Sequence, residues 1–117
     1  MSPKRGDRVA PPAVPGGWEL RFATSDASKG WEELCQQAPG NSRGAWNELS
    51  SRPDKPVATP RHHQLKGSLA TASHRGVQME QWQVEVTGGG RVWYLVDGER
   101  RTLWFKVAST GHPKATE

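Results

Sequence analysis

Apolar and polar side chains alternate along the last third of the chain with a period of two, which is typical of β-strands. The segment from Gln81 to Lys114 predicts three strands joined by two tight turns. The first turn, Thr87–Gly90, contains three glycines that tolerate positive φ, and the second contains Asp97–Gly98, a strong hairpin signal. Antiparallel pairing of these strands therefore predicts a small β-meander.

The alternation also divides the side chains of this meander between two faces. One face carries apolar rows that we expect to pack on helices: Trp82, Val84 and Val86; Val92, Tyr94 and Val96; and Leu103, Phe105 and Val107. The other face carries a mixed set: Gln83, Glu85, Arg91, Trp93, Leu95, Trp104 and Lys106. Two tryptophans are unusual on a solvated surface, so we expect this second face either to be covered or to be the functional face.

The preceding part of the chain predicts a strand and a helical hairpin. Residues 18–24 alternate as a half-buried strand does. The candidate caps of the first helix are Thr24, Ser25 and Asp26. Its buried stripe is Ala27, Trp31, Leu34, Cys35 and Ala38, and Pro39–Gly40 ends it. The second helix is expected to be capped by Asn41 or Ser42, to bury Ala45, Trp46 and Leu49, and to stop at Pro53.

The remaining segments predict less regular structure. Residues 52–60 are expected to be a loop, residues 63–69 a short strand, and residues 70–77 a polar turn. Residues 1–17 are rich in Pro and Gly, which predicts a flexible basic tail before a single domain at 18–117. The expected fold class is α+β, a small antiparallel sheet with a two-helix hairpin packed on one face.

Composition narrows the class of protein. Of the 117 residues 33% are hydrophobic, and the formal net charge of +4 favours an acidic partner, either nucleic acid or an acidic protein. The single cysteine, Cys35, cannot form an internal disulfide, and no apolar run is long enough for a signal peptide or a membrane span. We therefore expect a cytoplasmic protein that does not interact with membranes.

The order strand, helical hairpin, strand and three-stranded meander resembles the RelE/ParE superfamily of bacterial toxins. Three short motifs add to the resemblance. Gln64–Gly67 looks like the "LKG" that opens the second strand of the family, and Arg91–Asp97 resembles its "R-h-x-Y-x-V" third strand. The segment Ala108–Lys114 falls where these toxins carry a C-terminal His, Lys or Arg.

This resemblance implies a toxin of a type II toxin–antitoxin system, and in its RelE-like branch a ribosome-dependent mRNA endonuclease. Such enzymes drive the 2′-hydroxyl of the substrate at the adjacent phosphate without a metal. The resemblance places Arg91 against the scissile phosphate, makes His112 an acid or base, and adds the cations Lys66 and Lys114. It also implies a cognate antitoxin, with the helix-turn-helix class as a candidate, and mRNA on the ribosome as the second partner.

Our expected catalytic set is therefore Arg91, His112 and Lys114. The expected RNA-binding set is Lys66, Arg75, Trp93, Trp104 and Lys106. The general base stays open, with Glu80 and Glu85 only nearby. The alternative is a toxin-fold binding module without catalysis, such as a ParE-like inhibitor of DNA gyrase.

We predict neither a cofactor nor a metal site. His62 and His63 are adjacent and cannot easily share one ion, and His74 has no cysteine partner in the sequence around it.

Overall fold

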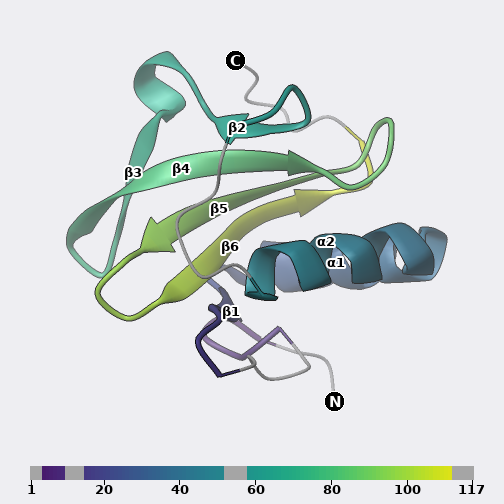
Figure 1. Cartoon of the computed structure of the whole chain (residues 1–117), viewed down its shortest axis with the longest axis horizontal. Coiled ribbons are helices and arrows are strands. Elements are labelled where there is room, and N and C mark those ends of the chain that lie inside the picture. The colour runs from purple at the N-terminus through teal and green to yellow at the C-terminus, as the bar shows by residue number, and fades with distance from the viewer. Residues whose placement is uncertain (1–3, 10–14, 52–57, 112–117) are drawn as a thin grey trace.

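The computed structural model describes residues 4–9, 15–51 and 58–111. In chain order the elements are β1 (Glu19–Phe22), α1 (Ser25–Gln37), α2 (Pro39–Ser51), β2 (His62–Gln64), the 3₁₀ helix η1 (Gly67–Leu69), β3 (Thr71–His74), β4 (Val77–Glu85), β5 (Arg91–Asp97) and β6 (Thr102–Ser109). The six strands form one sheet, with the two α-helices side by side against it (Figure 1). The predicted α+β fold, with two helices packed on a sheet, is confirmed.

The strand order is β1-β6-β5-β4-β2, and β3 also pairs with β4. The antiparallel meander of β4, β5 and β6 agrees with the prediction, whereas β1 runs parallel to β6. The sheet is therefore mixed rather than wholly antiparallel. In the sequence, two helices lie between β1 and the other strands. Parallel pairing needs a long connection of this kind, because a tight turn can join only antiparallel neighbours.

Both helices begin at residues suited to a helix N-terminus. The hydroxyl Oγ1 of Thr24 accepts a hydrogen bond from the backbone N–H of Ala27 at 3.0 Å, so Thr24 is the cap of α1. Helix α2 begins at Pro39 rather than after a cap at Asn41 or Ser42. Proline suits the first helical position because the N–H that it lacks has no partner within the helix. Neither described α-helix is long and apolar enough to cross a membrane.

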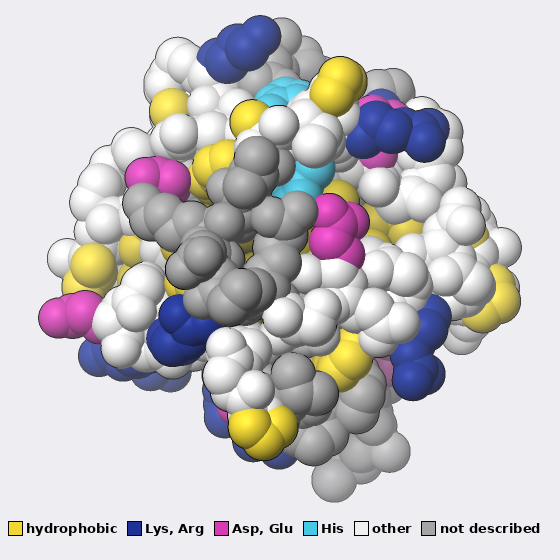
Figure 2. All heavy atoms as spheres, viewed as in Figure 1, with side chains coloured by type: hydrophobic (Ala, Val, Ile, Leu, Met, Phe, Trp, Pro, Cys, Tyr) yellow, Lys and Arg dark blue, Asp and Glu magenta, His cyan; other side chains and the backbone are white. Residues whose placement is uncertain are grey.

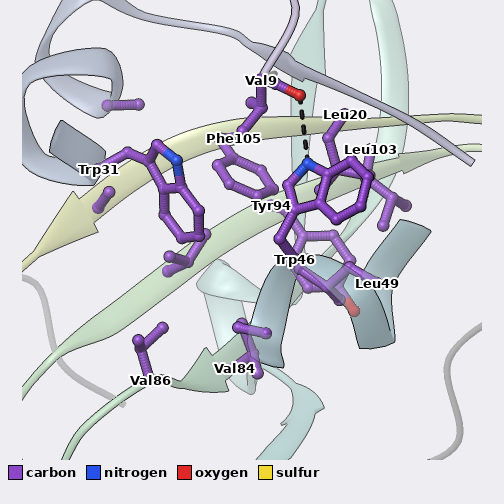
Figure 3. Close-up of a cluster of buried hydrophobic side chains, with 14 of the residues drawn as sticks. Val9, Leu20, Trp31, Trp46, Leu49, Val84, Val86, Tyr94, Leu103 and Phe105 are labelled. Atoms are coloured by element: carbon purple, nitrogen blue, oxygen red, sulfur yellow. Dashed lines mark hydrogen bonds between the residues drawn. The ribbon is translucent and has the colours of Figure 1, made fainter. Parts of the chain in front are cut away.

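The main core lies between the helices and the sheet. As predicted, the inner rows of β4 and β5 and the tryptophans of both helices belong to it. Trp31 packs edge-on against Phe105 with ring centroids 5.3 Å apart, and the indole Nε1 of Trp46 donates a hydrogen bond to the carbonyl of Val9 at 3.2 Å (Figure 3).

The segment 4–9 is part of this fold, which corrects the expected flexible tail for these residues. The N–H of Gly6 donates to the carbonyl of Phe22, and the N–H of Val9 donates to Leu20, both at 2.7 Å. The segment therefore lies antiparallel along the edge of β1 that does not pair with β6, and Val9 is fully buried. Residues 1–3 and 10–14 of the expected tail lie outside the described residues.

A β-bulge changes the pattern of β6. Tyr94 pairs with Phe105 and Trp93 pairs with Val107, so Lys106 is an extra residue between the two pairs. The alternation reverses after the bulge. Val107 consequently leaves the helix-facing row to which the pattern assigned it, and Ala108 joins the core in its place.

The strands that pair with the outer side of β4 also differ from the prediction. The expected strand 63–69 is divided into β2 and η1, and the expected polar turn 70–77 contains β3. Strand β4 then begins at Val77, several residues before the predicted meander. Both short strands pair with β4, one with each half of it.

Candidate functional site

The sheet face opposite the helices has a small apolar cluster of its own. It consists of Ala23, Met79, Leu95 and Trp104, with Ala72 of β3 packed against them. Trp93 and Trp104 are each only 4% exposed. The two rings are thus covered in this structure, which is the first of the two alternatives expected for this face; both also belong to the expected RNA-binding set.

A pocket of about 530 Å³ opens beside Trp104. Four separate parts of the chain line it: the N-terminal segment, the end of β1, the β3–β4 hairpin and β6. The lining residues are Arg5, Gly6, Ala23, His74, Arg75 and Trp104. The guanidinium of Arg21 donates to the carbonyl of Gly6 at 2.8 Å, and this bond helps to hold the N-terminal segment at the pocket.

The turn of the β3–β4 hairpin brings two of these side chains over Trp104. His74 pairs with Val77, so Arg75 and Gly76 form a two-residue turn, with φ of 54° and 78°. Positive φ is unfavourable for a residue with a Cβ, and an arginine here costs about 1–2 kcal/mol relative to glycine. Cζ of Arg75 lies 5.1 Å from the ring of Trp104, and the His74 and Trp104 ring centroids are 4.4 Å apart.

The charges around His74 are mostly positive. Burial lowers the pKa of His74, and the neighbouring Arg75 lowers it further, with smaller effects in the same direction from Arg5 and Lys106. Asp97 opposes this shift. Arg5 and Arg75 form no ion pair with any described residue. Two arginines that form no ion pair with a described residue, beside an imidazole whose charged form is disfavoured, are suited to receive an anion.

Asp97 is the one acidic residue among the groups that shift the pKa of His74. Its carboxylate oxygens already have partners. Its Oδ2 accepts a hydrogen bond from the Trp104 indole at 3.3 Å and lies 3.4 Å from Nη1 of Arg100. Asp97 is buried and does not line the pocket, so its role here is to hold the indole of Trp104 through this hydrogen bond.

Arg91, the expected phosphate-binding arginine, has a different position. It is 8% exposed, and its Nη1 donates to the carbonyls of Thr87 and Gly90 at 3.1 and 3.2 Å. Its Nη2 lies 3.2 Å from the carboxylate of Glu85. The guanidinium therefore closes the β4–β5 turn and does not line the pocket.

The other predicted site residues are spread over the molecule. Lys66 is exposed just before η1 and does not line the pocket, and the indole Nε1 of Trp93 donates to Gln83 at 2.8 Å. His112 and Lys114 lie outside the described residues. Of the predicted set, the structure brings together Arg75 and Trp104, with Lys106 close enough to affect His74.

Arg5 and His74 were absent from the predicted site. Gly76 between two alternating runs indicates a turn, but Arg75 is not a residue that a two-residue hairpin turn favours, so the local sequence does not place His74 at the end of a strand. Nothing in the sequence indicates that Arg5 reaches this face, because the pairing of segment 4–9 is a tertiary contact.

The three histidines in the described part of the chain do not form a cluster. His62 lies on the helix-facing side, where its Nε2 and the hydroxyl of Tyr94 are 2.5 Å apart, while Nδ1 of His63 lies 3.1 Å from the carbonyl of Gln64. Among the described residues no group of three or more His, Cys, Asp or Glu could hold a metal ion.

Exposed cations also occur away from the pocket, for example Arg61 and Lys66. On the face shown in Figure 2, Lys and Arg side chains occur at several places among Asp, Glu and uncharged side chains, and some of them lie near one another at the lower left. The pocket beside Trp104 is therefore distinguished by the convergence of Arg5 and Arg75 on one cavity rather than by a general excess of charge.

Comparisons with known proteins do not assign the chain to a family. No family model matches it, and neither a curated protein nor a solved structure is significantly similar to it.

Proposed function

We propose that this protein is a toxin of a type II toxin–antitoxin system that binds mRNA on the ribosome and cleaves it. The observation that supports this proposal is the pocket beside Trp104. It is lined by a histidine and by two arginines that form no ion pair with any described residue. Phosphate groups are recognised by arginine through paired, charge-assisted hydrogen bonds. Cations that converge from separate segments fit a phosphodiester better than a small neutral ligand.

The proposed reaction is attack of a ribose 2′-hydroxyl on the adjacent phosphorus. Arg5 and Arg75 would hold the phosphate and stabilise the extra negative charge that develops on its oxygens. Lys106 adds positive charge nearby, while Trp104 forms the floor of the pocket. Arg91 acts indirectly by keeping the β4–β5 turn in shape. His112 and Lys114 remain candidates for proton transfer and phosphate binding.

A cognate antitoxin belongs to this proposal. A toxin that cleaves cellular mRNA must be inhibited in the cell that makes it, and the net charge of +4 favours an acidic segment as the inhibitor. We place this segment over the cationic pocket, where it would compete with RNA.

One observation favours a second candidate, a binding module that inhibits DNA gyrase without cleaving nucleic acid. The arginine that the resemblance placed at the scissile phosphate is engaged by Glu85 and by the carbonyls of its own turn. A protein that only binds does not need that arginine free.

Two assays distinguish these candidates. Purified protein is added to a defined translation reaction and the mRNA is mapped by primer extension, and in parallel it is added to a supercoiling reaction with DNA gyrase. We expect mRNA cuts that require the ribosome and no effect on supercoiling. Intact mRNA together with inhibited supercoiling selects the second candidate, and no effect in either assay rejects both.

The variant pair Arg75→Asn and Arg61→Asn links either activity to the pocket. Both substitutions remove one positive charge, but Arg61 lies near Glu85 at the other end of β4 and does not line the pocket. Asparagine tolerates the positive φ of residue 75. Loss of activity in Arg75→Asn with Arg61→Asn unchanged assigns the activity to the pocket. Equal effects indicate a general loss of charge.

A further inference from the structure

We propose that His74 is the proton acceptor in the RNA cleavage proposed for this pocket. This inference rests on the proposed function, because it names the base that the cleavage reaction requires. A general base must reach the proton that it removes and must be unprotonated at the working pH. The position, surroundings and competitors of His74 each bear on these requirements.

The position of His74 allows it to reach a ligand in the pocket. His74 is the last residue of β3 and lines the pocket together with Arg5 of the N-terminal segment and Arg75 of the hairpin turn. Its Nε2 is fully buried without a hydrogen bond to any described residue. Nδ1 is thus the nitrogen that a ligand in the pocket can reach. In the neutral ring, the tautomer with hydrogen on Nε2 leaves the lone pair on Nδ1.

The surroundings of His74 disfavour the protonated ring. The groups that face His74 are Arg75 on its own hairpin, Arg5 from the N-terminal segment, Lys106 on β6 and Asp97 on β5. Burial and the three cations lower the pKa of His74, and only Asp97 raises it. These groups consequently disfavour the charged form of the imidazole. The same cations attract a phosphate, so one arrangement both frees the base and binds the substrate.

No other described acidic residue or histidine both lines the pocket and lies beside its arginines. The carboxylate of Glu85 is engaged by Arg91, and Glu80 accepts from the indole of Trp82 at 3.1 Å. His62 faces the helices beside Tyr94, and His63 does not line the pocket. Neither carboxylate lines the pocket, so His74 is the titratable base that the described part of the chain presents to a bound ligand.

The bond changes follow from this position. Nδ1 of His74 takes the proton of the 2′-hydroxyl while the 2′-oxygen forms a bond to the phosphorus of the 3′-phosphate. The bond between phosphorus and the 5′-oxygen of the next nucleotide breaks, and that oxygen takes a proton from water. The products are a 2′,3′-cyclic phosphate and a free 5′-hydroxyl, and His74 then returns its proton to the solvent, so no other reactant is consumed.

The backbone at the turn supports a functional role for this hairpin. A two-residue turn with positive φ at both positions favours Asn-Gly or Gly-Gly. Arginine at position 75 is strained there, and strain of this kind concentrates at functional sites. Asparagine or glycine would stabilise the turn but would leave His74 without the cation beside it.

The test uses the full chain in the translation reaction with His74→Gln and the matched control His63→Gln, a histidine on the same sheet face outside the pocket. We expect His74→Gln to lower the single-turnover cleavage rate by roughly 10²–10⁴-fold, as typical for loss of a general base. Binding of an mRNA analogue that carries 2′-deoxyribose at the cut position should change less than about threefold. His63→Gln should match the parent in both measurements.

The pH profile gives a second readout. For the parent, kcat/KM should fall on the acidic side with a midpoint below the ordinary histidine value of 6.5. His74→Gln should lack this limb. If His74→Gln melts at a much lower temperature than the parent, cleavage by His74→Ala is measured with and without added imidazole. Recovery of cleavage supports the inference, and no recovery overturns it.

Failure of this inference and failure of the proposed function look different. If the parent cleaves mRNA and His74→Gln cleaves as fast, His74 is not the base, while the proposed function stands. If the parent leaves mRNA intact, both are overturned. If the parent cleaves the 2′-deoxy substrate, the 2′-hydroxyl is not the nucleophile and His74 has no such proton to accept.

Discussion

Gly30 of α1 lies against the backbone of Ala108 in β6: a Cβ atom on residue 30 would be 1.8 Å from the carbonyl oxygen of residue 108. Glycine in a helix is ordinarily a weakness. Here it allows α1 to approach the sheet closely, so that Trp31 reaches Phe105. The contact is between two backbones and cannot relax by rotation of a side chain.

The first prediction concerns this contact. Gly30→Ala should lower the free energy of unfolding by about 1–3 kcal/mol or more, because the added methyl group forces α1 away from β6. Gly44→Ala is the matched control, since nothing lies within 4 Å of its would-be Cβ in α2. It should stabilise the protein by about 0.5–1 kcal/mol. Urea denaturation of both variants tests the pair, and two stabilised variants would contradict the proposed close contact.

The second prediction concerns Arg91. Removing its guanidinium leaves the carbonyls of the β4–β5 turn without their donor and Glu85 without its partner. Arg91→Ala should therefore lower the free energy of unfolding by about 1–3 kcal/mol. A melting temperature equal to that of the parent would show that these bonds contribute nothing. Toxicity of this variant is informative only at a temperature where it is folded.

The third prediction concerns segment 4–9. Val9→Ala should cost about 2 kcal/mol, because it removes two buried methyl groups and leaves a small cavity beside Trp46. Deletion of residues 1–9 should lower the melting temperature further, and it should also weaken RNA binding because Arg5 is lost. The single variant Arg5→Ala separates these effects, as it should weaken RNA binding and leave the melting temperature almost unchanged.

The fourth prediction concerns acid stability. Since the folded state lowers the pKa of His74, the unfolded state binds this proton more tightly. The contribution of His74 to the free energy of unfolding is fully present at pH values above 6.5, the pKa of the unfolded state. It is lost as the pH falls below 6.5 towards the lower pKa of the folded state. His74→Gln should lose less stability than the parent between about pH 7.5 and pH 5.5. Equal losses, measured by chemical denaturation, would contradict the shift.

The sequence predicted the parts of this fold that follow from local pattern. The meander, the two helices and the inner rows of β4 and β5 depend on periodicities that the chain displays directly. The bulge at Lys106 could not be predicted, because an extra residue in one strand is visible only in its pairing with the partner strand. Val107 was placed on the wrong face for this reason.

The candidate site was less predictable than the fold. Arg91 was assigned to the site because of its motif, but its burial depends on the conformation of the Thr87–Gly90 turn, whose carbonyls converge on the guanidinium. His74 and Arg5 are 69 positions apart in sequence and meet only because the β3–β4 hairpin and segment 4–9 reach the same side of Trp104. Such convergence is a property of the tertiary structure.

The pairing of segment 4–9 with β1 also affects how the molecule behaves among its own copies. The edge of β1 that does not pair with β6 would otherwise offer the backbone groups of Leu20 and Phe22 to any extended peptide. Open strand edges promote association between sheets and aggregation. By occupying that edge, segment 4–9 keeps the sheet from growing on the β1 side, so a protease that removed these few residues would convert a discrete molecule into one prone to self-association.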